Sequence, residues 1–112
     1  MAYDETLVVR VRQTLSEMGG ADEISMMGGL CFMRGGNMAC GVSGERLMVR
    51  LGNEAAAKAA KAEDVALLQI GGGRIARAFV TVDPASIADP SSLAAWVSRG
   101  VNFADRLPPK NR

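Results

Sequence analysis

The sequence predicts an α+β fold, a two-layer arrangement in which an antiparallel sheet carries helices on one face. Apolar residues first recur at helical spacing, then alternate with a period of two between glycine-rich turns, and later return to helical spacing. The length of 112 residues and the lack of a linker-like stretch indicate one domain spanning residues 1–112. The expected order of elements is α-β(3)-α-β(2)-α.

The first expected helix runs from Asp4 to Met18. Asp4 is a suitable N-cap, and Gly19-Gly20 ends the helical pattern. The residues at helical spacing, which should face the core, are Leu7, Val8, Val11, Leu15 and Met18.

Three strands are expected next, over 23–34, 38–42 and 46–51, and Gly28-Gly29 should form a bulge or bend in the first. Gly35-Gly36 and Gly44-Glu45 suit two-residue hairpin turns, and together they fix a register in which Cys31 faces Cys40. The face expected to be the core carries Cys31, Met33, Met38, Cys40, Val42, Leu47, Val49 and Leu51. The other face carries Leu30, Phe32, Arg34, Ala39, Gly41, Arg46, Met48 and Arg50.

The second half of the chain predicts a short helix, a hairpin and a long helix. Asn53 should cap an alanine-rich helix through Ala62, and strands over 65–70 and 75–82 should flank a Gly71–Gly73 loop. Asp89-Pro90 is a strong helix start, and Gly100 could bend the helix that follows. Residues 108–112 are expected to form a flexible tail.

Composition narrows the classes of function. The formal net charge is +1, so a strongly basic surface for nucleic acid is not expected, and histidine is absent. No nucleophile–base pair or metal-ligand spacing stands out, so we expect a non-enzymatic protein without cofactor or metal. The acidic start and the lack of a long apolar run predict a cytoplasmic protein without a membrane span.

The mixed sheet face is the candidate interaction surface, because arginines surround an aromatic residue and a methionine. Two interpretations stay open: a protein interface, which includes a homodimer, and a solvated face with scattered apolar residues. Direct nucleic-acid binding is not favoured. The surface comprises Phe32, Arg34, Arg46, Met48 and Arg50.

Two further features have alternative interpretations. Cys31 and Cys40, if directly opposed, could form a redox disulfide, or they are two small buried residues. The hairpin residues Gly72, Gly73, Arg74 and Arg77 could form a ligand loop for phosphate or nucleic acid, or a plain flexible turn.

Several strings, in order along nearly the whole chain, resemble the N-terminal domain of the TfoX/Sxy family of bacterial competence regulators. They include Met26-Met27-Gly28-Gly29, Arg46-Leu47-Met48-Val49-Arg50 and Val82-Asp83-Pro84, and Leu107-Pro108-Pro109-Lys110 closes the chain. The sequence departs from the family pattern at Met27, Ile75, Ala76, Ala78 and Phe79.

The resemblance implies a secretion-chaperone-like α-β(3)-α-β(2)-α fold. It also implies a regulatory or adaptor role by protein–protein contact, since two-domain relatives act as transcriptional co-regulators alongside the cyclic-AMP receptor protein. The partner would then be another protein, such as a transcription regulator. The alternative is a small-ligand or nucleic-acid binding module that uses the 71–77 hairpin.

Overall fold

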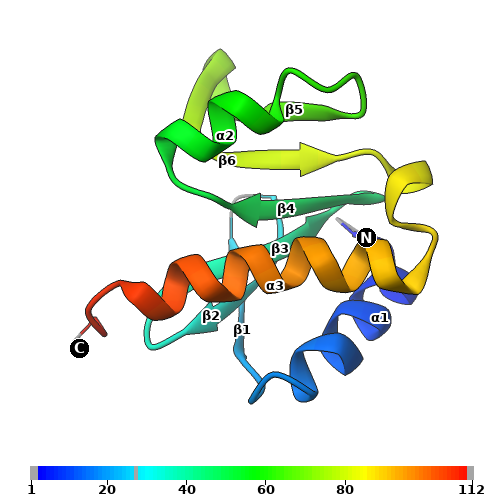
Figure 1. Ribbon diagram of the computed structural model, residues 1–112, viewed down its shortest axis with the longest axis vertical. Coiled ribbons are helices and arrows are strands. Elements are labelled where there is room, and N and C mark those ends of the chain that lie inside the picture. The colour runs from blue at the N-terminus through cyan, green and yellow to red at the C-terminus, as the bar shows by residue number, and fades with distance from the viewer. Residues whose placement is uncertain (1–2, 27, 111–112) are drawn as a thin grey trace.

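The computed structural model describes residues 3–26 and 28–110, which form a six-stranded antiparallel sheet with three α-helices on one face (Figure 1). The expected α+β class with one helical layer is therefore confirmed. The strand order is β1-β2-β3-β4-β6-β5. The elements are α1 (Glu5–Ser16), β1 (Asp22–Met26), β2 (Gly29–Arg34), β3 (Asn37–Ser43), β4 (Arg46–Arg50), α2 (Asn53–Ala59), β5 (Val65–Ile70), β6 (Arg74–Val82) and α3 (Pro90–Arg106), with 3-10 turns at Gly71–Gly73 and Pro84–Ile87.

Side-chain caps begin the first and last helices, as the sequence predicts. The Asp4 carboxylate accepts a hydrogen bond from the Thr6 amide at 3.0 Å, and the Asp89 carboxylate accepts from the amides of Ser91 and Ser92. Both helices therefore begin where the local sequence supplies an acceptor for the first free amides.

The prediction that Asn53 caps α2 is wrong by one residue, because Gly52 occupies the cap position. Gly52 has φ = 90°, and a Cβ there would lie 2.7 Å from the Phe103 ring. Only glycine combines this backbone conformation with so close an aromatic neighbour. α2 also ends at Ala59, three residues before the expected end.

The segment over 23–34 forms two strands rather than one. Ile24 pairs with Cys31 and Met26 with Gly29, so the chain reverses between β1 and β2, and Gly28 has φ = 76°. Met27 lies outside the described residues. Gly28 thus lies in a hairpin turn and Gly29 begins β2, where a bulge or bend was expected.

The predicted register between β2 and β3 is correct next to the turn but shifts further along the two strands. Met33 pairs with Met38 as predicted, but Phe32 pairs with Cys40, which leaves Ala39 as the extra residue of a β-bulge. Because side chains alternate between faces, one extra residue inverts the faces of β2 relative to the prediction. The prediction of the core face is therefore wrong for Cys31, Met33 and Met38, while Phe32 turns toward the helices.

The helices cover a main core that draws on every helix and on most strands. Its largest fully buried side chains include Phe32, Leu15 and Leu47. α3 crosses the sheet close to the bulge, where a Cβ on Gly100 would lie 2.2 Å from the Ala39 carbonyl oxygen. Gly100 therefore lets the helix approach the sheet backbone.

Residues 108–110, expected to belong to a flexible tail, instead contact the β2–β3 turn. The side-chain amide of buried Asn37 donates to the Pro108 carbonyl at 3.1 Å, and the Lys110 amide donates to the Gly35 carbonyl at 2.8 Å. A buried amide requires a partner, and the chain end supplies it. Residues 111–112 lie outside the described part.

Candidate functional site

The predicted interaction surface does not exist as one exposed face. Phe32 is 1% exposed and belongs to the helix-covered core, whereas Met48 is 0% exposed and belongs to a second cluster on the opposite face of the sheet. The bulge at Ala39 explains the error, because it places Phe32 and Met48 on different faces. Both residues stabilise the fold and neither is available to a partner.

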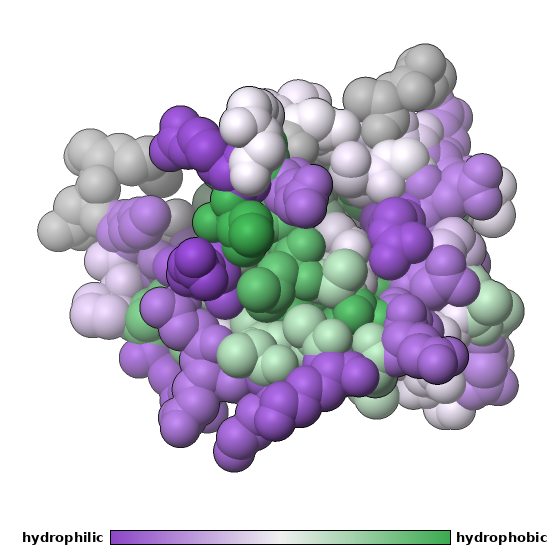
Figure 2. All heavy atoms as spheres, turned by 90° about the horizontal axis from the view of Figure 1, so that it is seen from above, coloured by the Kyte–Doolittle hydropathy of each residue, from purple (hydrophilic) through white to green (hydrophobic). Residues whose placement is uncertain are grey.

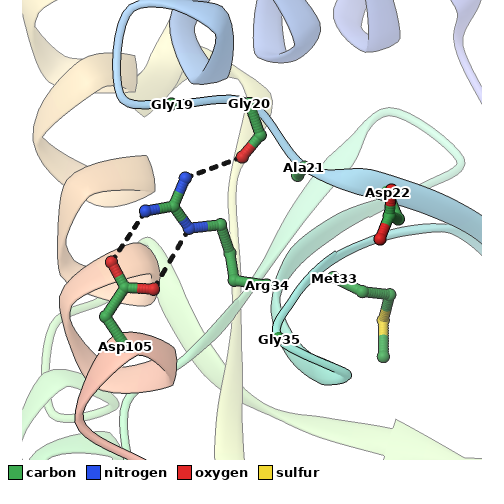
Figure 3. Close-up of a pocket in the computed structure, with 8 residues that line it drawn as sticks. All are labelled: Gly19, Gly20, Ala21, Asp22, Met33, Arg34, Gly35 and Asp105. Atoms are coloured by element: carbon green, nitrogen blue, oxygen red, sulfur yellow. Dashed lines mark hydrogen bonds and ion pairs between the residues drawn. The ribbon is translucent and has the colours of Figure 1, made fainter. Parts of the chain in front are cut away.

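Arg34 joins three segments rather than facing solvent (Figure 3). Its Nε and Nη2 atoms donate to the two carboxylate oxygens of Asp105 on α3, at 3.1 and 2.7 Å. Its Nη1 atom donates to the carbonyls of Met18 and Gly20 in the loop between α1 and β1, at 2.9 and 2.7 Å. This bidentate pair fixes the guanidinium, so Arg34 lacks the freedom that an anion-binding arginine needs.

An open hollow of about 460 Å³ lies beside this arginine, and Figure 3 shows the residues that line it. Its walls are mostly polar backbone and the Arg34–Asp105 pair. Hydrogen bonding to Arg34 lowers the pKa of Asp105 and raises the pKa of Arg34. The charges of Arg34 and Asp105 therefore neutralise each other, and Asp22 is the other charged residue in the lining.

Substituting Arg34 with methionine should destabilise the domain by about 2 kcal/mol, because the Met18 and Gly20 carbonyls and Asp105 all lose a charged donor. The melting temperature should fall by roughly 10 °C. Because the pKa of Asp105 is lower in the folded chain, the pair stabilises the domain above the ordinary carboxyl pKa. This contribution is lost as the pH falls through the lowered value.

Thermal melting between pH 7 and pH 2 measures both effects, and the matched control is Arg12→Met. The Arg12 side chain is 52% exposed, against 18% for Arg34, and it pairs with Glu23 but binds no carbonyl, so its loss should be much smaller. Equal losses for the two variants would contradict the structural role of Arg34.

The remaining two arginines of the predicted surface also have internal partners. Arg46 pairs with Asp83 at 3.3 Å. The Arg50 guanidinium lies 5.5 Å from the ring centres of both Phe79 and Phe103, and its buried Nε has no hydrogen-bond partner within the described residues. Cation–π attraction to the two rings stabilises this position and joins β4 to β6 and α3.

The sheet face opposite the helices holds the second cluster, and no helix of the described chain covers it (Figure 1). Gly41 lies at its centre, where a Cβ would come within 2.9 Å of the Met48 methyl and 3.2 Å of the Met38 methyl. The buried members are Cys31, Met33, Met38, Met48 and Leu68, with Ile70, Ala76 and Phe79 partly buried beside them. We call this the open sheet face.

The β1 edge adds exposed apolar side chains to the open sheet face. Ile24 is 47% exposed and pairs with Cys31, and directly paired residues of neighbouring strands share a face. Met26, two residues further, is 38% exposed on the same side. Sequence reasoning missed both because it merged β1 with β2; the double glycine at 28–29 is the signal that separates them.

Cys31 and Cys40 are free thiols that lie on opposite faces of the sheet. The bulge pairs Cys31 with Gly41, so the predicted direct opposition of the two cysteines is wrong. Burial raises the pKa of both thiols, that of Cys40 to about 12. The interpretation as two small buried residues fits this geometry, because side chains on opposite faces do not meet to form a disulfide.

The predicted ligand loop is a hairpin connection that leads into a strand. Gly72 and Gly73 have φ = 74° and 76°, and Arg74 begins β6, so no helix start follows the glycines. Arg74 and Arg77 are exposed. Within residues 3–26 and 28–110, no group of three or more His, Cys, Asp or Glu is arranged to hold a metal ion.

The fold and the open sheet face define a class: a small α+β domain with helices on one face of an antiparallel sheet and an apolar, methionine-rich floor on the other. The family model described as the TfoX N-terminal domain matches residues 13–104, so the chain belongs to this family. No curated protein and no solved structure matches it. None of the helices in the described segments combines the length and apolar character needed to cross a membrane.

Proposed function

We propose that this TfoX N-terminal domain is a non-enzymatic regulatory or adaptor domain that acts in the cytoplasm by contact with another protein, a transcription regulator. The observation that carries the proposal is the pair of exposed apolar residues Ile24 and Met26, which border the buried methionine floor of the open sheet face. The exposed Met26 side chain is flexible and polarisable, so it adapts well to a protein partner. Large exposed apolar residues beside such a floor are typical of an interaction site.

The charges around the face support a protein partner over nucleic acid. Arg46 is paired with Asp83, and Arg50 is held between two aromatic rings. On the β1 side Asp22, which pairs with Met33 of the open sheet face, would repel phosphates. An apolar floor with a polar rim is the usual anatomy of a protein–protein interface.

The family resemblance makes the cyclic-AMP receptor protein of the same cell the first partner to test. Purified partner should bind the wild-type domain in a titration calorimeter, and Ile24→Lys combined with Met26→Lys should weaken binding at least about tenfold. The control is Val9→Lys, because Val9 is 45% exposed but lies on α1. If binding survives the double variant or is lost equally with the control, the open sheet face is not the contact.

A further inference from the structure

The edge strand β5 lacks charges and prolines, although its pairing with β6 shifts register between Leu67 and Leu68. β5 (Val65–Ile70) is the last strand in the sheet order and pairs only with β6 among the described residues. Its sequence, Val-Ala-Leu-Leu-Gln-Ile, contains no charge and no proline. Lysines, prolines and bulges usually protect an exposed edge, and a long uncharged edge strand is a template for another strand.

The surface around this edge is apolar. Figure 2, which looks onto this end of the molecule, shows hydrophobic residues gathered in a central patch with hydrophilic residues around it. Ile75, on the neighbouring strand, is 43% exposed, Ala66 is exposed, and Leu67 and Ile70 are only partly buried. Apolar side chains thus accompany the free edge on both faces of the sheet.

The charges of α2 suit a second copy of the same chain. α2 packs over β6 and β5, with Glu54 in its first turn and Lys58 in its last turn. A two-fold axis perpendicular to the sheet would pair β5 with its copy in antiparallel fashion and set the two α2 helices antiparallel. Glu54 of one copy would then lie toward Lys58 of the other, which is complementary.

We propose that two copies of this chain associate through antiparallel pairing of their β5 edges, joining the sheets into one continuous sheet with all helices on the same side. The two-fold axis preserves the faces of the sheet, so helix-side residues such as Leu67 meet helix-side residues of the second copy. The same patch serves both copies and the contact closes at a dimer. Leu68 and Ile70 of β5 also belong to the open sheet face, but Ile24 and Met26 lie on β1 at the opposite end of the sheet, so the β5 contact does not depend on the function proposed for that face.

The other edge strand provides the control, because all five residues of β1 are exposed but the strand carries Asp22 and Glu23. The test variant is Ala66→Lys with Gln69→Lys, two exposed positions on opposite faces of β5, and the control is Ser25→Lys. Light scattering at micromolar concentrations should give a dimer for the wild type and for Ser25→Lys. The β5 variant should be a monomer, with a dissociation constant raised at least about tenfold.

A wild-type monomer at every concentration would overturn the proposal, as would a dimer that Ser25→Lys disrupts and the β5 variant leaves intact. If the β5 variant fails to fold, a second pair of variants tests the proposed dimer. Glu54→Lys should weaken the dimer by opposing two lysines, and adding Lys58→Glu should restore it. Failure of the combined variant to restore the dimer would also count against the proposal.

Discussion

Replacing Phe32 with alanine should destabilise the domain by about 4 kcal/mol, the largest effect that we expect from a single substitution. The side chain is 1% exposed and belongs to the core that the helices cover. Truncation removes the apolar transfer free energy of the ring and leaves a cavity. A domain of this size is stable by roughly 5–15 kcal/mol, so much of its stability would be lost. Urea unfolding, followed by circular dichroism, measures the change.

The same experiment distinguishes a core residue from a contact residue. Had Phe32 been exposed on an interaction surface, alanine would leave the unfolding midpoint nearly unchanged. The matched control is Ile24→Ala, because Ile24 is a large apolar residue that is 47% exposed. Its effect should stay within about 0.5 kcal/mol. Similar midpoints for Phe32→Ala and the wild type would refute the position of β2 relative to the helices.

Replacing Gly100 with alanine should destabilise the domain by about 3 kcal/mol, although alanine is the better helix former. Helix propensity alone predicts a gain of about 1 kcal/mol in the middle of α3. A Cβ at this position, however, would lie 2.2 Å from the Ala39 carbonyl oxygen and 3.2 Å from Val49. The helix would have to move away from the sheet and lose packing on both sides of the contact.

The control for Gly100→Ala is Gly71→Ala, where a new Cβ would meet nothing within 4 Å. That variant should stay within about 0.5 kcal/mol of the wild type by the same unfolding measurement. A more stable Gly100→Ala protein would show that α3 does not approach the β3 backbone as closely as described. That result would not contradict the helix N-caps or the registers of the hairpins.

Local signals predicted the starts of the first and last helices and several turns correctly. Asp4 and Asp89 cap their helices as expected, and the turns at Gly35-Gly36 and Gly44-Glu45 lie where the sequence puts them. These features depend on contacts between residues a few positions apart, which a sequence shows directly. The same holds for the β5–β6 hairpin, whose first strand matches the expected bounds.

The contacts of Arg34 in the candidate site were harder to predict, because they join residues that are far apart in the sequence. Arg34 was correctly placed on a strand, but its partners Asp105 and the Met18 and Gly20 carbonyls come from other elements. No local pattern in the sequence identifies them. Asp105 stands on the last turns of a helix with an ordinary amphipathic pattern, where a surface carboxylate is the usual interpretation.

The sequence by itself determined the family and the α+β class. It also determined the caps of α1 and α3 and the turns at Gly35-Gly36 and Gly44-Glu45, since these depend on residues near one another in the chain. Only the tertiary structure decided which face of β2 meets the helices. α3 lies against the sheet where Gly100 meets Ala39, and the bulge at Ala39 inverts the alternation of β2. A single unpaired residue therefore places Phe32 in the core and Cys31 on the open sheet face, because side chains on a strand alternate with a period of two.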